Sequence, residues 1–133
     1  AGVHPAKSKG RVMVVDDDPT ALKLARAALE PLGYRAICYS SSISGLAAAE
    51  SDQADAVVLD LLMPEMDGFE FLDRLRKSPS GRDLPVIVWS NQDLTGEEKE
   101  RLRCAAQGIA AKSQGGVDAV VRELQAQLSA KGF

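Results

Sequence analysis

The sequence has few of the residue types on which disulfide, zinc and histidine sites depend. Its 133 residues include only two cysteines and one histidine. Cys38 and Cys104 are far apart and fit no CxxC or other ligand-pair spacing, which argues against a disulfide framework or a zinc site. We expect both to be small, buried hydrophobic residues. His4 lies among small and basic residues near the N-terminus, so histidine-based chemistry within this chain is not expected.

The sequence also lacks an excess of positive charge and a long apolar stretch. Its formal net charge is -3, and charges of both signs are interspersed. No basic surface of the kind that neutralises nucleic-acid phosphates is therefore expected. No apolar run has the length of a membrane span, and residues 1–11 lack the apolar core of a signal peptide. We expect a cytoplasmic location, protein partners, and no contact with nucleic acid or membrane.

The length and composition predict one compact domain, because 45% hydrophobic and 26% charged residues fit a chain with its own core and leave no room for a second domain. The composition changes only at the N-terminus. Residues 1–10 are predicted to be a disordered tail or a remnant left by cloning. Residues 11–130 are predicted to form the domain.

Short apolar runs rich in valine and isoleucine alternate with helical patterns along this domain. Strands are predicted over residues 12–15, 36–39, 57–61, 86–89 and 109–111. Helices are predicted over about residues 19–32, 42–50, 69–77, 95–106 and 117–130. The alternation predicts an α/β fold with a doubly wound, five-stranded parallel sheet.

The helix over about residues 95–106 differs from the others because it has little apolar surface besides Leu102 and its alanines. We expect it to be held loosely. Its charges allow two surface ion pairs, Glu97 with Arg101 and Glu100 with Arg103, each of which would contribute only a few tenths of a kcal/mol.

Reactive polar residues lie at or directly after the ends of four of the predicted strands: Asp16 and Asp17, Asp60, Ser90, and Lys112. In a parallel sheet these residues would meet at the carboxyl edge, where such sheets bind ligands. Adjacent acids repel one another unless a cation neutralises them, which indicates a divalent metal with oxygen ligands. Asp18, before a proline, is expected to cap the following helix instead.

Asp60 follows a buried strand, where a carboxylate without a partner is costly. A metal shared with Asp17 would supply that partner, and a carboxylate held in this way can attack phosphorus to give an aspartyl phosphate. The Ser90 hydroxyl can bond a phosphoryl oxygen, and the Lys112 ammonium can neutralise one. Each signal is weak alone, but their ordered occurrence predicts a phosphate and metal site.

From Arg11 to Ala130 the chain resembles the receiver domain of two-component response regulators. The resemblance rests on residues 14–19 (VVDDDP), residues 60–68 (DLLMPEMDG), Ser90 and Lys112. It implies a flavodoxin-like three-layer sandwich with strand order 2-1-3-4-5. It further implies that Asp60 is the phosphoacceptor and that Pro64 and Gly68 shape the loop after it.

The resemblance also implies the metal and its ligands. Asp16, Asp17 and Asp60 would hold Mg²⁺ together with the main-chain carbonyl of Leu62. Ser90 would be the switch hydroxyl, and Lys112 the cation that pairs with the phosphoryl group. The donor would be a sensor histidine kinase or a histidine phosphotransfer domain, and a fused or separate output domain would respond. The domain would be no enzyme beyond promoting its own phosphotransfer and dephosphorylation.

The sequence departs from the family pattern at several positions. Ser113 replaces the proline that usually follows the lysine, Ile109 stands where many relatives have an aromatic residue, and Asn91 replaces a small residue. Gln92 and Leu62 occupy positions that tune loss of the phosphoryl group in this family, and Gln92 is expected to affect its lifetime. The segment after Asn91 and the missing proline resemble receivers attached to hybrid sensor kinases.

Three other classes of function share features with this sequence. Asp16, Asp18 and Thr20 also resemble the nucleophile motif of haloacid-dehalogenase-type phosphatases, with Asp16 as nucleophile, but no acidic pair follows Lys112 and Asp60 is left unexplained. A protein-binding module without phosphorylation is another alternative, because fold does not fix function. A flavin-binding domain is disfavoured, because three acids after the first strand would repel the cofactor phosphate.

Overall fold

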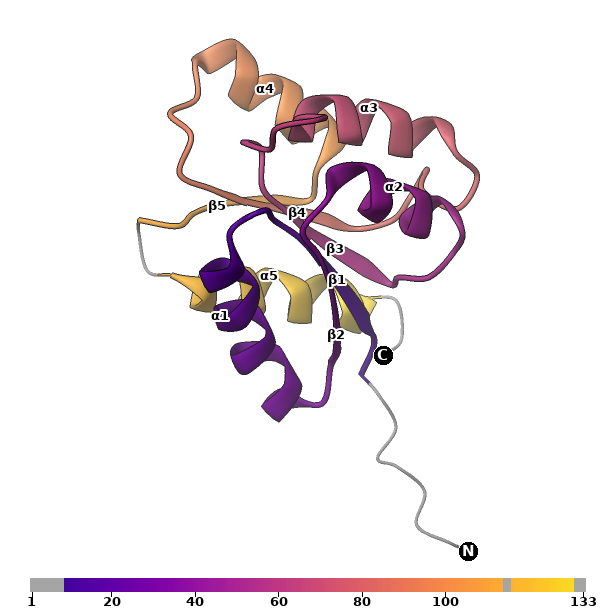
Figure 1. Ribbon diagram of the computed structural model, residues 1–133, viewed down its shortest axis with the longest axis vertical. Coiled ribbons are helices and arrows are strands. Elements are labelled where there is room, and N and C mark those ends of the chain that lie inside the picture. The colour runs from indigo at the N-terminus through magenta and orange to yellow at the C-terminus, as the bar shows by residue number, and fades with distance from the viewer. Residues whose placement is uncertain (1–8, 114–115, 131–133) are drawn as a thin grey trace, which may run out of the picture.

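The computed structural model describes residues 9–113 and 116–130 and has alternating strands and helices (Figure 1). The strands are β1 (Arg11–Val15), β2 (Arg35–Tyr39), β3 (Ala56–Leu59), β4 (Val86–Ser90) and β5 (Gly108–Ala111). The helices are α1 (Pro19–Leu29), α2 (Ser42–Glu50), α3 (Gly68–Lys77), α4 (Gly96–Ala105) and α5 (Val117–Ala130). All strand pairs are parallel, in the order β2-β1-β3-β4-β5. The predicted fold class and strand order are confirmed.

Helices cover both faces of the sheet, α1 and α5 on one face and α2, α3 and α4 on the other (Figure 1). Successive residues of β1 point alternately to these faces: Met13 and Val15 pack in the core beneath α2–α4, whereas Val12 and Val14 pack beneath α1 and α5. Because both faces are buried, the central strands need apolar side chains throughout. This burial explains why the strands appear in the sequence as continuous valine-rich runs.

The first helix and the third strand end earlier than predicted, in each case where the backbone changes direction. The α-helix that begins at Pro19 ends at Leu29, and a short 3₁₀ helix (Glu30–Leu32) follows. Pro31 has no N–H group to continue the α-helical bonds, so the helix cannot extend to Leu32. β3 ends at Leu59, two residues earlier than predicted, because the chain turns after Asp60 into the loop before α3.

Helix α4 is attached to the rest of the fold mainly at its C-terminal end. Leu102 is its only buried residue. The Arg76 guanidinium, on α3, donates hydrogen bonds to the carbonyls of Ala105 (2.9 Å), Leu84 (2.6 Å) and Gly81 (2.7 Å). Burial lowers the pKa of Arg76. Helix α4 therefore has few apolar contacts along its length, and its loose attachment stays a prediction.

One of the two expected ion pairs on α4 forms and the other does not. Glu100 pairs with Arg103, as predicted. The predicted pair between Glu97 and Arg101 is wrong: the Arg101 guanidinium instead donates to Asp73 Oδ2, on α3, at 2.9 Å. The same guanidinium carbon lies 4.9 Å from the centroid of the Phe69 ring. Arg101 therefore pairs with an acid on α3 instead of with Glu97 on its own helix.

The expected burial of both cysteines is wrong, since neither is fully buried. The Cys104 side chain is exposed on α4, whose outer face contacts solvent, whereas Cys38 is half-buried on β2. Both thiols are free. The absence of a disulfide between them agrees with their spacing in the sequence.

The predicted N-terminal tail falls mostly outside the described residues, and so does His4. Lys9, which the sequence assigned to that tail, donates its backbone N–H to the Gly33 carbonyl at 3.0 Å. The boundary at residue 11 stays a prediction. Of the helices in the described part of the chain, none has the length and apolar character needed to cross a membrane.

Candidate functional site

Backbone hydrogen bonds beyond the strand ends place the predicted site residues at one edge of the sheet. The N–H of Asp16 donates to the Tyr39 carbonyl (3.0 Å), and the N–H of Asp60 donates to the Val15 carbonyl (3.0 Å). The N–H of Lys112 donates to the Ser90 carbonyl at 3.1 Å. Each residue thus continues the parallel ladder by one step. The sheet itself holds the four chain segments together.

Three carboxylates meet at this edge. One oxygen from each of Asp16, Asp17 and Asp60 lies within 4.8 Å of the other two. Asp16 and Asp60 are buried, with 1% and 6% of their surface exposed, whereas Asp17 is exposed. Oxygen ligands around an opening to solvent are what Mg²⁺ prefers, because it retains several of its waters. The donor set therefore fits a hard divalent cation.

Lys112 partly neutralises the three carboxylates. Its Nζ donates to Asp16 Oδ2 at 2.6 Å and lies 3.6 Å from Asp60 Oδ2. The ammonium also lies 5.3 Å from the centroid of the Trp89 ring, a cation–π distance. One cation facing three acids leaves an excess of negative charge that a metal ion would balance.

The pKa of Asp16 is raised above its ordinary value, chiefly because burial disfavours the charged carboxylate. The Lys112 ammonium and the backbone N–H of Asp18 donate hydrogen bonds that oppose this rise, while the Asp60 charge adds to it. Because the net shift is upward, the hydrogen bonds from the protein do not fully offset the cost of burying this carboxylate charge. Added positive charge would stabilise its ionised form.

Asp18 does not join the cluster. Its Oδ1 accepts a hydrogen bond from the Thr20 N–H at 3.0 Å and caps α1, as predicted. The two acids before it point to the site, whereas the third terminates the helix. Of the three consecutive aspartates, two therefore belong to the acidic cluster and the third caps α1.

The loop after Asp60 is closed tightly against its own backbone. The Gly68 N–H donates to the Leu61 carbonyl at 3.0 Å. A Cβ atom on Gly68 would lie 2.8 Å from the Asp60 carbonyl oxygen, which is closer than side-chain carbons approach. Leu62 donates its N–H to Asp60 Oδ1 at 3.5 Å, and its side chain is 57% exposed. The role of the Leu62 carbonyl as a metal ligand stays a prediction.

Ser90 lies at the same edge but makes a different contact. Its buried hydroxyl accepts a hydrogen bond from the Gln92 N–H at 3.2 Å. In the described part of the chain it has no hydrogen bond to Asp60 or Lys112. Ile109 is 41% exposed on β5, and the peptide between Lys112 and Ser113 is trans.

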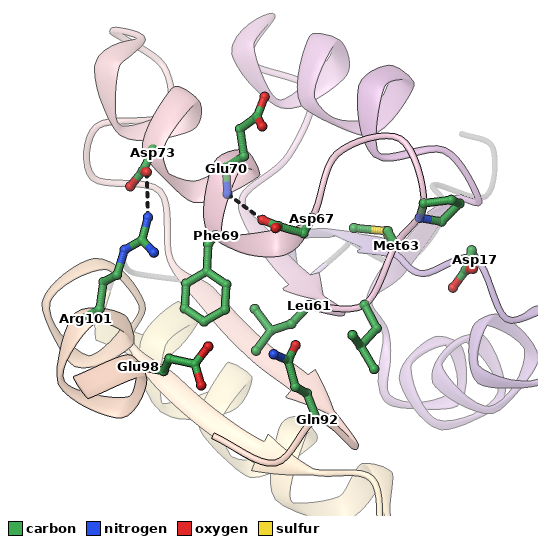
Figure 2. A pocket seen from close by; sticks show the side chains of 12 residues that line it. Asp17, Leu61, Met63, Asp67, Phe69, Glu70, Asp73, Gln92, Glu98 and Arg101 are labelled. Atoms are coloured by element: carbon green, nitrogen blue, oxygen red, sulfur yellow. Dashed lines mark hydrogen bonds and ion pairs between the residues drawn. The ribbon is translucent and has the colours of Figure 1, made fainter. Parts of the chain in front are cut away.

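A groove of about 760 Å³ runs from the acidic cluster to the cleft between α3 and α4. Asp17 and Gln92 line it near the site, and Phe69, Glu98 and Arg101 line it farther away (Figure 2). No pattern in the sequence indicated this groove. Its walls come from helices that are separated in the sequence, and no local spacing relates Phe69 to Arg101.

Comparisons with known proteins agree with this geometry. The family model for the response regulator receiver domain matches residues 12–123. Response regulator MprA of Mycobacterium ulcerans is 35% identical over 96 residues, which are 72% of this chain and 40% of MprA. The chain thus spans less than half the length of that relative.

Two solved structures extend the comparison to three dimensions. The N-terminal domain of a response regulator receiver protein from Methanoculleus marisnigri is 30% identical, with a TM-score of 0.71 over 88% of this chain and 92% of that one. The receiver domain of a sensor histidine kinase from Pseudomonas aeruginosa is 26% identical, with a TM-score of 0.79 over 90% and 98% of the two chains. That structure has a magnesium ion coordinated in its active-site cleft.

Proposed function

Because this chain belongs to the response regulator receiver domain family, we propose that Asp60 accepts a phosphoryl group from a phosphohistidine donor. The observation that carries the proposal is the position of the Asp60 carboxylate, which lies among two further acids and 3.6 Å from the Lys112 ammonium. This arrangement offers a nucleophile, a cation for the phosphoryl oxygens and ligands for a metal. The identity of the phosphoryl donor and the existence of an output domain that responds to phosphorylation belong to the same proposal.

In the proposed transfer an Asp60 carboxylate oxygen attacks phosphorus in line with the bond to the donor imidazole. The oxygen–phosphorus bond forms as the phosphorus–nitrogen bond breaks, and the leaving imidazole takes a proton from solvent. Lys112 stabilises negative charge on the equatorial oxygens. Asp16, Asp17, Asp60 and the Leu62 carbonyl would hold Mg²⁺, which when bound supplies further positive charge to these oxygens.

The phosphoryl group would add negative charge beside Ser90 and Lys112. We infer that the Ser90 hydroxyl leaves its contact with the Gln92 N–H and donates to a phosphoryl oxygen. The loop that follows Ser90 leads into α4, whose only buried residue is Leu102. A loosely packed helix can be shifted between two arrangements at low cost. The changed surface would then regulate a partner or a fused output domain.

The donor would be a sensor histidine kinase or a histidine phosphotransfer domain. Similarity to the receiver domain of a Pseudomonas aeruginosa sensor kinase supports a place in a phosphorelay. Similarity to MprA, a longer response regulator, supports an output segment elsewhere in the protein. The receiver itself is proposed to act as a signalling domain and not as an enzyme on other substrates.

The proposed function is tested by incubating the protein with Mg²⁺ and a small acyl phosphate and measuring its intact mass. We expect one phosphoryl adduct, which is lost when EDTA is present from the start, because the acids repel an incoming phosphate without the metal. The adduct should be labile to hydroxylamine, as an acyl phosphate is. A protein that gains no adduct from the small donor or from a phosphorylated histidine protein would contradict the proposal.

Mg²⁺ is expected to raise the melting temperature. A ligand that binds only the folded state at ten times its Kd stabilises that state by about 1.4 kcal/mol, or roughly 4 to 7 °C for a domain of this size. The Asp17→Asn variant should lose most of this shift. Asp18→Asn is the matched control, because asparagine also caps helices. Equal shifts in both variants, measured by differential scanning fluorimetry, would show that the cluster is not the metal site.

A further inference from the structure

The groove between α3 and α4 combines an apolar floor with acidic walls (Figure 2). Leu62 contributes a largely exposed side chain, with 57% of its surface accessible. The half-buried Phe69 ring lies deeper, between α4 and the start of α3. A groove lined by an exposed leucine and an accessible aromatic ring is the kind of surface that a partner's apolar side chains cover.

The acids that line the groove outnumber the cations. They are Asp17, Asp67, Glu70, Asp73 and Glu98, against the single cation Arg101. Arg101 is already paired with Asp73 and lies over the Phe69 ring. Glu70 is paired with Arg74, at 2.7 Å, on its own helix. The groove therefore presents an excess of negative charge.

Three of these acids, Asp17, Asp67 and Glu98, have no cationic partner among the described residues, and helix caps hold the last two. Asp67 caps α3 by accepting from the Glu70 N–H at 2.9 Å, and Glu98 accepts from the Thr95 N–H at 2.9 Å. Within residues 9–113 and 116–130, no lysine or arginine lies within ion-pair distance of either carboxylate. Both are placed on the rim by rigid helix caps, so their positions are fixed before any partner arrives.

We propose that this groove docks a basic, amphipathic segment of a partner protein, with apolar side chains on Leu62 and Phe69 and lysines or arginines facing Asp67 and Glu98. The acidic walls disfavour nucleic acids and anionic membranes, whose phosphates they would repel. An apolar floor beside fixed charges matches an amphipathic segment better than a small cation. The inference goes beyond phosphotransfer, because the groove extends from Asp17 and Leu62, at the proposed metal site, along α3 and α4.

The test is a titration of the isotope-labelled, unphosphorylated chain with a short amphipathic peptide of lysine and leucine. A second peptide has glutamate in place of lysine. The lysine peptide should shift the backbone amide signals of Leu62, Phe69 and Glu98, and the glutamate peptide should not bind. The variant Asp67→Asn/Glu98→Gln retains both caps, because asparagine and glutamine accept the same hydrogen bonds. It should bind the lysine peptide roughly tenfold more weakly.

The matched control is Glu50→Gln/Glu97→Gln, which removes the same charge from exposed positions that do not line the groove. It should retain the affinity within about twofold. Equal weakening in both double variants, shifts that map to another surface, or no binding at all would each overturn the proposal. Phosphoryl adduct formation, from the small donor and from a phosphorylated histidine protein, is measured on the same wild-type sample. An adduct without peptide binding rejects only the groove, whereas binding without an adduct rejects only the proposed function.

Discussion

Asp60→Asn is expected to abolish the phosphoryl adduct and to leave the fold intact. An asparagine amide has nearly the same shape as the carboxylate, but it lacks the charged oxygen that attacks phosphorus. Lys112 should retain its contact with Asp16, which is 2.6 Å in the wild type, so its half-buried ammonium keeps a partner. Intact mass after incubation with Mg²⁺ and an acyl phosphate measures the adduct, and circular dichroism measures the fold.

An adduct that persists in Asp60→Asn would move the nucleophile to another residue, Asp16 foremost. The geometry speaks against that outcome, because Asp16 is 1% exposed and one of its oxygens is held by Lys112. Asp18→Asn is the matched control and should still be phosphorylated, because Asp18 serves as a helix cap. Loss of the adduct in Asp18→Asn would instead favour the phosphatase-type mechanism, in which Asp18 acts as the acid.

The sequence predicts which residues gather at the carboxyl edge of the sheet better than it predicts their contacts. Asp16, Asp60 and Lys112 follow apolar runs, and the parallel ladder necessarily brings strand ends to one edge. Which acid the Lys112 ammonium contacts depends on the conformations of the side chains. Its shorter distance to Asp16 than to Asp60 could not be predicted from the spacing of these residues in the sequence. The bond between Ser90 and the Gln92 N–H depends in the same way on a local turn.

The fold was predictable where burial leaves a pattern in the sequence, either a continuous apolar run or apolar residues at helical spacing. Both faces of the central strands are covered, so their valine-rich runs are easily recognised. Helix α4 has little such periodicity, and the exposure of Cys104 and the contact of Arg101 with Asp73 both depend on how α4 lies against α3. Pairings between separate helices have no local signature in one sequence.

Gly68→Ala is expected to destabilise the domain by about 1 to 3 kcal/mol, the usual cost of overpacking, and to slow phosphorylation. The added Cβ would lie 2.6 Å from Leu61 Cδ2 and 2.8 Å from both the Asp60 carbonyl oxygen and Leu61 Cα. The leucine methyl group can rotate away, but the two backbone atoms cannot. Relief therefore requires the backbone beside the proposed nucleophile to shift. Chemical denaturation measures the loss of stability, and intact mass against time measures the rate.

Gly96→Ala separates this steric effect from the general consequence of replacing a glycine at the start of a helix. Gly96 begins α4 as Gly68 begins α3, but a Cβ there would have no neighbour within 4 Å. The control should be neutral or more stable by up to about 1 kcal/mol, because alanine favours helix over glycine. If the two variants unfold at the same denaturant concentration, the close approach of Gly68 does not constrain the loop. If only Gly68→Ala loses both stability and phosphorylation rate, the glycine that ends the 60–68 motif is required for the backbone geometry at Asp60.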